Sequence, residues 1–255
     1  MTVKQRYFIE LAYDGTKYHG WQSQHNAISV QEVLNKALSI VFRQPIDALG
    51  CGRTDTGVHA KQFFAHFDME TTDHDLSAMD YALLSRSLNS ILPDDIAIKQ
   101  LIPVAANAHA RFDATSRSYE YHIHFDKDPF KTIYSWQLRD KPDLELMNQA
   151  AKIMMEYTDF SCFSKSNTQT KTNNCKITNA KWIQQDKGIV FQISADRFLR
   201  NMVRAIVGTL LMVGRKEIQP VGIRQIIESK NRSNAGTSVP ACGLYLTQVK
   251  YPFLD

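Results

Sequence analysis

Apolar residues recur along the chain at two spacings, one typical of strands and the other typical of helices. Aromatic and β-branched side chains gather in residues 7–13, 62–67, 97–104 and 244–251, which we expect to form strands. Residues 119–125 alternate most regularly, with apolar side chains at every second position. This stretch therefore predicts a half-buried antiparallel strand.

Helical spacing marks five further segments, each with one apolar face. The first opens at Ser29, and Glu32 stands three residues later, as in a capping box. Pro142 and Pro220 are favoured first-turn residues for two of the others. The apolar faces lie within residues 29–41, 76–88, 142–154, 202–214 and 220–227. Between the third and fourth helices, residues 182–185 and 189–193 predict a β-hairpin.

Strands and helices mix in both halves of the chain without the regular β-α-β repetition of a doubly wound sheet. We therefore expect an α+β fold with a mainly antiparallel sheet. The order of elements suggests two similar halves, residues 1–105 and residues 106–255, with a central cleft between them. The polar run at 164–174 has no apolar pattern and predicts a mobile loop.

Length and composition narrow the class of protein. No apolar run approaches the about 20 residues of a membrane-spanning helix, and residues 1–6 lack the apolar segment of a signal peptide, so we expect a cytoplasmic protein. The four cysteines form no CxxC pair, which favours reduced thiols over a metal site. The net charge is only +4, so any binding of a polyanion depends on local clusters of basic side chains.

Two polar stretches stand out between the periodic segments. Residues 51–60 read CGRTDTGVHA and place Asp55 among glycines and an arginine. This stretch is typical of an ordinary turn, and it is equally suited to a catalytic loop. Residues 17–24 read KYHGWQSQ. Their two aromatic rings suit stacking on nucleic acid bases, and they equally suit anchoring of a loop in the core.

Five stretches together resemble one family. They are GRTDTGVHA at 52–60, DGTKYHGWQ at 14–22, ATSRSYEY at 114–121, RFLRNMVRAIVG at 197–208 and VPACGLYL at 239–246. In this combination the chain resembles the tRNA pseudouridine synthase A family over almost its whole length. Departures from the family pattern are Thr56 for alanine, Glu120 where a basic residue is common, and Lys176 for a frequent arginine.

The resemblance implies a pseudouridine synthase fold and a set of site residues. Asp55 matches the essential catalytic carboxylate, and Arg204 matches an arginine that pairs with it and keeps it ionised. Tyr119 falls on the family's active-site tyrosine, which offers its ring to a uracil base. Leu244 belongs to the stretch that lines the cleft, and Arg53 is placed to fill the space left by an extruded base.

The same resemblance implies the reaction and the partners. Family members isomerise uridine to pseudouridine in the anticodon stem-loop of tRNA, at tRNA positions 38, 39 and 40, and they work as homodimers. The reaction breaks one glycosidic bond and forms another with no net redox change, so no metal, nucleotide or other cofactor is expected. Asp55 attack at C1′, attack at C6 and removal of the C2′ proton all stay open.

Basic residues beside these stretches are the candidate contacts to RNA phosphates. They are Lys17, Arg111, Arg117, Lys165 and Arg200. Two rival functions stay open at this stage. One is a non-catalytic RNA-binding protein on the same scaffold, and the other is a hydrolase of glycosidic bonds, which commonly needs two carboxylates.

Overall fold

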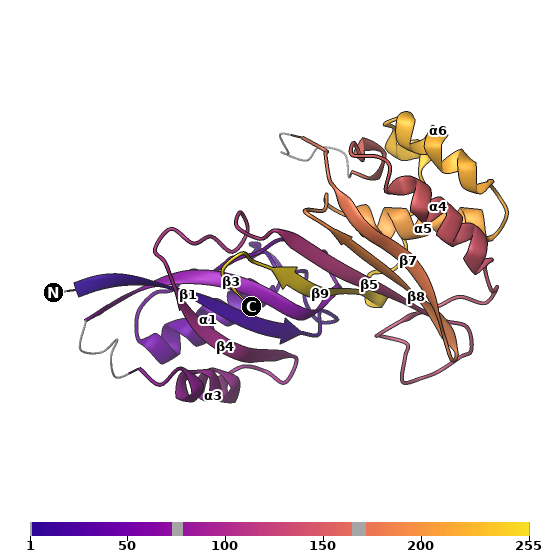
Figure 1. Cartoon of the computed structure of the whole chain (residues 1–255). Coiled ribbons are helices and arrows are strands. Elements are labelled where there is room, and N and C mark those ends of the chain that lie inside the picture. Colours follow the sequence, from indigo (N-terminus) through magenta and orange to yellow (C-terminus); the bar gives the residue numbers. More distant parts are fainter. Residues whose placement is uncertain (1, 73–78, 165–171, 255) are drawn as a thin grey trace. The chain divides into compact units, whose positions relative to one another are not determined.

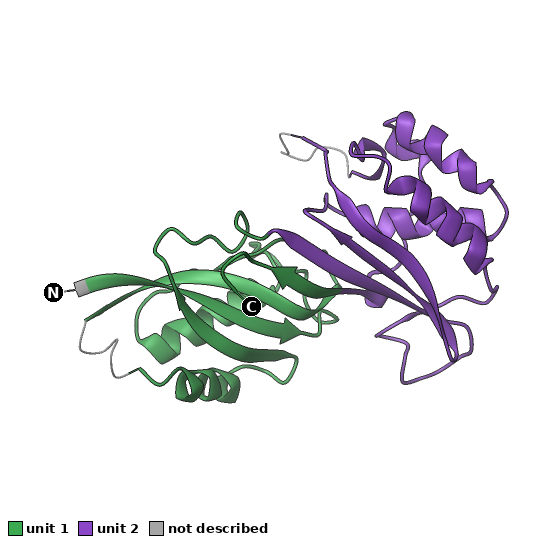
Figure 2. Cartoon of the chain, viewed as in Figure 1, with its two compact units in different colours: residues 1–114, 246–255 green, residues 115–245 purple. Residues whose placement is uncertain are grey.

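The computed structural model describes residues 2–72, 79–164 and 172–254. The chain forms two compact units (Figure 2): unit 1 contains residues 1–114 and 246–255, and unit 2 contains residues 115–245. The sequence places the division after residue 105 and assigns the C-terminus to the second half, whereas the last ten residues return to unit 1. The predicted mobile loop falls mainly on residues 165–171, which include Lys165. These residues and Leu76 lie outside the described part of the chain.

Unit 1 is built on an antiparallel sheet. The long strands β1 (Thr2–Tyr13) and β3 (His59–Thr72) pair with each other, and β4 (Ile96–Val104) adds to the free edge of β1. On the other side of β3 lies β9 (Leu244–Lys250), so the order within the unit is β4-β1-β3-β9. The short strand β2 (Leu49–Gly50) pairs with β3. All four strands predicted from apolar runs in this unit are confirmed.

Helix α1 (Val30–Phe42) begins where the sequence predicts it. Ser29 is the N-cap, and its hydroxyl accepts a hydrogen bond from the backbone N–H of Glu32 at 3.2 Å. The Glu32 carboxylate accepts from Nζ of Lys36, one turn later, at 2.9 Å. The side chain of Glu32 thus pairs with Lys36 along the helix. In a capping box it would instead accept from the backbone N–H of the N-cap residue.

Helix α3 (Tyr81–Ile91) begins later than its apolar pattern predicts. Asp80 caps the helix because its carboxylate accepts from the backbone N–H groups of Ala82 and Leu83. Leu88 is fully buried, but Leu83, which the pattern places on the buried face, is 55 % exposed. The polar cap therefore sets the start of this helix, and part of the predicted apolar face is on the surface.

The strands of unit 2 pair antiparallel in the order β5-β8-β7. β5 (Ser116–His124) pairs with β8 (Gly188–Ala195), and β8 pairs with β7 (Ile177–Gln185) in the predicted hairpin. β6 (Trp136–Gln137) adds to β5 in parallel. The alternation of β5 is only partly realised, because His124 on its polar face is 3 % exposed.

Helices α4 (Leu144–Met154), α5 (Met202–Gly214) and α6 (Ile223–Glu228) lie together on one side of this sheet (Figure 1). Asp143 caps α4, so Pro142 precedes the helix instead of forming its first turn. α5 is buried along nearly its whole length. Single 3₁₀ turns complete the described part of the unit at Ser161–Phe163, Pro220–Gly222, Arg232–Asn234 and Ala241–Gly243.

The mixed composition and the mainly antiparallel pairing confirm the predicted α+β fold class. Among the described residues no helix is both long and apolar enough to cross a bilayer. All four cysteines carry free thiols. Within the same described ranges, His, Cys, Asp and Glu side chains form no group of three or more that is arranged to hold a metal ion.

Candidate active site

The predicted catalytic residue Asp55 lies in unit 1, in the loop that joins β2 to β3. Its side chain is half-buried, and its carbonyl oxygen accepts from the N–H of Val58 at 3.1 Å, which closes a tight turn. Gly57 in that turn has a φ of 77°, a conformation that glycine adopts without strain. The turn interpretation and the catalytic interpretation are therefore compatible, because a closed turn holds the carboxylate in one place.

The segment 14–21 packs directly against the Asp55 loop. The N–H of Trp21 donates to the carbonyl of Thr54 at 3.4 Å, and the N–H of Gly57 donates to the carbonyl of Tyr18 at 3.2 Å. Gly20 has a φ of 84°, and a side chain there would overlap the carbonyl oxygen of Thr54. The second motif thus supports the first through backbone hydrogen bonds and a close approach that only glycine permits.

The two aromatic rings of this segment are core anchors. Trp21 is 1 % exposed and stacks on Phe63 with ring centroids 4.1 Å apart, and Tyr18 is 5 % exposed. The hydroxyl of Tyr13 lies 2.9 Å from Oγ1 of Thr54, next to Asp55. Of the two interpretations that the sequence leaves open, anchoring in the core is the one that the structure confirms for both rings.

His59 is a supporting residue that sequence reasoning did not single out. It begins β3 four residues after Asp55 and is 2 % exposed. Its Nδ1 accepts from the N–H of Gly15 at 3.1 Å and lies 3.0 Å from a carboxylate oxygen of Asp14. Its position inside GRTDTGVHA is the sequence signal that could have indicated this role. In the structure this histidine connects the Asp55 loop to the neighbouring motif.

Arg204 lies in unit 2 on helix α5 and is half-buried. Its Nε donates to the carbonyl of Val239 at 2.7 Å, and its own carbonyl accepts from the N–H of Val239. The first bond orients the guanidinium, and the second joins the backbones of the two residues. Arg204 is thus partly buried and held by the segment that contains Val239.

The segment that holds Arg204 runs along α5. The N–H of Gly236 donates to Oγ1 of Thr209 at 2.8 Å, and a side chain at Gly208 would overlap the carbonyl oxygen of Thr237. The segment ends at Pro240, whose carbonyl accepts from the hydroxyl of Tyr121 at 2.8 Å. α5 and β5 together therefore position the backbone that orients Arg204.

Tyr119 is half-buried on β5, opposite Ile193, and its ring meets Phe198 edge-on with centroids 5.1 Å apart. Tyr121, two residues later on the same face, is the fully buried ring. Burial of its hydroxyl raises the pKa of Tyr121 far above its usual value. The accessible ring is therefore Tyr119, as its predicted contact with a base requires, while Tyr121 is structural.

Leu244 is 5 % exposed and begins β9, directly after the 3₁₀ turn Ala241–Gly243. A side chain at Gly243 would overlap the carbonyl of His122 and crowd the ring of Tyr121. The backbone around Leu244 is thus held close to β5.

The predicted RNA-binding side chains differ in their surroundings. Arg53 is exposed beside Asp55, and Arg200 is exposed ahead of α5, because the helix begins only at Met202. Arg200 therefore lies outside the helix that carries Arg204. Lys17 is exposed and lies 3.3 Å from a carboxylate oxygen of Asp95.

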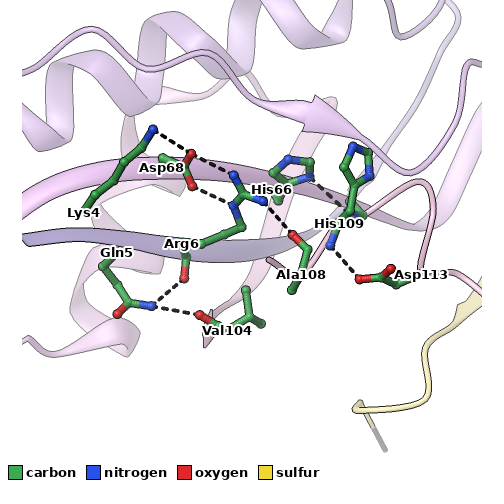
Figure 3. A network of polar contacts seen from close by, with 10 residues as sticks. Lys4, Gln5, Arg6, His66, Asp68, Val104, Ala108, His109 and Asp113 are labelled. Atoms are coloured by element: carbon green, nitrogen blue, oxygen red, sulfur yellow. Dashed lines mark hydrogen bonds and ion pairs between the residues drawn. The ribbon is translucent and has the colours of Figure 1, made fainter. Parts of the chain in front are cut away.

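Arg111 and Arg117 have more structured positions. Arg117 is half-buried, and its Nη1 donates to the carbonyl of Asp196 at 2.9 Å. The Arg111 guanidinium lies 5.8 Å from the ring centroid of Phe112, and the N–H groups of both residues point at Nδ1 of His109. Figure 3 shows the polar contacts on which this segment rests.

The residues that depart from the family pattern have ordinary local partners. Glu120 accepts from Nε2 of Gln192 and lies 3.1 Å from Nε2 of His122, so its charge is engaged on the sheet. Lys176 is exposed, and its backbone N–H donates to the carboxylate of Asp196.

Comparison with known proteins identifies relatives of the chain. Residues 150–252 match the family model described as tRNA pseudouridine synthase, which contains Arg204 and its supporting segment. Proteins named tRNA pseudouridine synthase A match over almost their full length. That of Bacteroides fragilis is 51 % identical over 97 % of both chains. That of Parabacteroides distasonis is 50 % identical over 97 % of this chain and 96 % of its own. That of Clostridium acetobutylicum is 38 % identical over 95 % and 98 %.

Fold and matches together define a tRNA-modifying isomerase that makes pseudouridine from uridine. Within that class, the chain belongs to the tRNA pseudouridine synthase A family. Both rival functions, the non-catalytic RNA-binding protein and the hydrolase, are thereby set aside.

Proposed function

We propose that the enzyme isomerises uridines in the anticodon stem-loop of tRNA, with Asp55 as the catalytic residue. The observation that carries the proposal is the double anchoring of the Asp55 loop, by backbone bonds to the segment 14–21 and by the close approach of Gly20. Catalysis needs a reacting group held in one geometry, and a surface turn has no need of such support.

Arg204 and Tyr119 complete the proposed set of residues. Arg204 acts as the cation that keeps the carboxylate of Asp55 ionised, because an arginine partner offsets the cost of taking a carboxylate out of water. Support comes from the bond between its Nε and Val239, which leaves the guanidinium in one orientation. Tyr119 offers its ring to the uracil, with Leu244 beside it, and its hydroxyl serves to move the proton at C5.

The chemistry balances without any added group. The N1–C1′ bond breaks, the base turns while it is held, C5 bonds to C1′, and the proton leaves C5 while N1 gains one. An ionised Asp55 serves equally for attack at C1′, attack at C6 or removal of the C2′ proton. These reaction steps release no free uracil, and its release would indicate hydrolysis instead.

The decisive experiment is to incubate the protein with an unmodified tRNA transcript, without cofactor, and to map pseudouridine along the strand. Asp55→Asn should abolish modification and keep tRNA binding. The matched control is Asp186→Asn, a change of the same charge in the exposed turn between β7 and β8, which should leave both unchanged. Full activity of the Asp55 variant would refute the assignment.

Arg53 is proposed to occupy the space left by the flipped base. Its side chain is exposed, so Arg53→Ala should leave the fold intact while turnover on tRNA falls. Arg86→Ala on the exposed side of α3 removes the same charge and serves as the control. Equal kinetics of the two variants would discard the role of Arg53.

Four basic side chains are the proposed phosphate contacts: Lys17, Arg111, Arg117 and Arg200. The enzyme is further proposed to act as a homodimer in the cytoplasm, with one tRNA contacting both subunits. Sedimentation of the protein at micromolar concentration tests the dimer, and a monomer that retains full activity would contradict it.

A further inference from the structure

Among the described residues of unit 1, Phe112 is the most exposed large apolar side chain. It lies in the segment that connects β4 to β5, and it is 74 % exposed. Single apolar side chains on a surface are common and by themselves indicate nothing. What sets Phe112 apart is how firmly the residues around it hold the exposed ring.

The ring of Phe112 packs on the ring of His109, with centroids 4.2 Å apart and planes 30° apart. Nδ1 of His109 accepts from the N–H of Arg111 at 3.1 Å and from the N–H of Phe112 at 3.2 Å. An accepting Nδ1 carries no proton, and burial lowers the pKa of His109, which favours this neutral ring. His109 therefore supports both the backbone and the side chain of Phe112.

A second ring lies behind the first. His66 on β3 packs against His109 with centroids 4.6 Å apart, and its Nδ1 accepts from the N–H of Ala110 at 3.1 Å. The carbonyl of Ala110 accepts in turn from the hydroxyl of Tyr251 at 2.6 Å. The segment is thus attached to β3 and to the C-terminal residues of the same unit.

An ion pair on β1 and β3 provides the third attachment (Figure 3). Nη1 of Arg6 donates to the carbonyl of Ala108 at 3.0 Å, while its Nε and Nη2 donate to Asp68 at 2.7 and 2.9 Å. The carboxylate of Asp113 accepts from the N–H of His109 at 2.7 Å, so the segment is also closed on itself. A surface ring that is already held in one place loses little conformational entropy when it binds a partner.

The chemistry beside the ring suits a nucleotide. The guanidinium of Arg111 lies 5.8 Å from the ring centroid of Phe112, and both side chains are exposed. Proteins bind unpaired nucleotides by stacking the base on an aromatic side chain and placing a cation near the phosphates. An apolar partner without charge would use the ring and leave the neighbouring guanidinium without a role.

We propose that Phe112 is a stacking platform for an unpaired base of the tRNA, with Arg111 as the cation for an adjoining phosphate. The proposal rests on tRNA as the substrate. The base is one other than the reacting uridine, which is proposed to lie against Tyr119. Phe112 thereby adds an aromatic contact to the proposed phosphate contacts.

The test measures binding of the full-length enzyme to an unmodified tRNA transcript. Phe112→Ala removes the ring and should weaken binding about fivefold or more, which is the usual effect of losing one stacked base. Phe112→Leu keeps an apolar side chain without a ring face and should weaken binding similarly, whereas Phe112→Trp should bind within about twofold of the wild type. The control is Phe130→Ala, which removes an 87 % exposed ring from unit 2 and should change affinity less than twofold. Equal affinity of the alanine, leucine and tryptophan variants would overturn the proposal.

The salt dependence separates stacking from charge. Stacking releases no counterions, so Phe112→Ala should keep the wild-type slope of log affinity against log salt. Arg111→Gln should lower that slope by about 0.7–0.9. A phenylalanine variant that loses slope as the arginine variant does would contradict a stacking role.

Two measurements on the free protein exclude other roles of the ring. The urea midpoint of Phe112→Ala should match that of the wild type, and a loss of affinity confined to variants with lowered midpoints would show a structural ring. Sedimentation of Phe112→Ala should also match the wild type, because a change would assign the ring to a contact between copies of the chain. Pseudouridine mapping is carried out in parallel. A wild type that binds tRNA and modifies no anticodon uridine would fail the proposed function, while the affinities still decide the role of Phe112.

Discussion

His66 on β3 gives a quantitative prediction of how stability depends on pH. Its side chain is 6 % exposed, and its Nδ1 accepts from the N–H of Ala110 at 3.1 Å, which requires that this nitrogen carry no proton (Figure 3). Burial is the main cause that lowers the pKa of His66 to about 4, and the positive charge of Arg6 and the ring of His109 add to it. The carboxylates of Asp68 and Asp113 act in the opposite direction and do not cancel the shift.

The sign and size follow from the two pKa values. In the unfolded chain His66 has its ordinary pKa of 6.5, so below that pH the unfolded state takes up a proton that the folded state refuses. The stability is therefore fully present above pH 6.5 and is lost as the pH falls towards 4. At pH 4.5 the loss is at most about 2.5 kcal/mol, since each pKa unit corresponds to about 1.4 kcal/mol.

The variant His66→Asn separates this effect from the rest of acid unfolding. Asparagine can place Oδ1 near the position of Nδ1 and accept the same N–H, but it does not titrate. Urea unfolding at pH 7.5 and at pH 4.5 should therefore show the variant losing about 2.5 kcal/mol less than the wild type. His25→Asn, at an exposed position, is the control and should follow the wild type. If wild type and His66→Asn lose the same free energy between these pH values, the reasoning is refuted.

Two further predictions concern the backbone that supports the proposed catalytic residues. Gly20→Ala should destabilise the fold by at least about 1 kcal/mol and lower turnover, because alanine resists the left-handed conformation and would displace the carbonyl of Thr54. The control is Gly52→Ala, whose new methyl group would have open space around it. This variant should unfold in urea like the wild type. Thr209→Val should lower the free energy of unfolding by about 1–3 kcal/mol and slow turnover, because it leaves the N–H of Gly236 without its acceptor. The control Thr178→Val, on the surface, should lower it by less than about 0.5 kcal/mol. Equal losses of stability within either pair of variants would contradict the prediction.

The sequence predicts most elements because their periodicity and their ends are local properties. The N-cap at Ser29 and the two-residue turn of the β7–β8 hairpin are encoded by neighbouring residues. The start of α5 is different: Asn201 adopts a left-handed conformation with a φ of 64°, and its side chain donates to Ser238. This contact is made with a residue 37 positions away in sequence, so the support for the first turn of the helix is not a local property.

Burial of polar side chains is also beyond local patterns. His124 stands in a strand where alternation predicts a polar face, yet it is buried. His66 on β3 likewise accepts from the N–H of Ala110, which is 44 residues away in sequence, and no local pattern indicates this contact. The return of the C-terminus to unit 1 is also not encoded locally, since no local signal indicates that β9 will pair with β3.

The motifs that carry the family resemblance are mostly structural, and this explains why they are long although the chemistry needs few side chains. Asp55 depends on a backbone contact between Gly20 and Thr54, and Arg204 depends on a second one between Gly208 and Thr237. In each case the segment with a proposed catalytic side chain is held against another segment at a glycine, where only hydrogen can occupy the space of a side chain. The glycines of the motifs therefore help to position the proposed catalytic residues, as the residues that flank these side chains do. Substitutions there should impair turnover even though no reacting atom is changed.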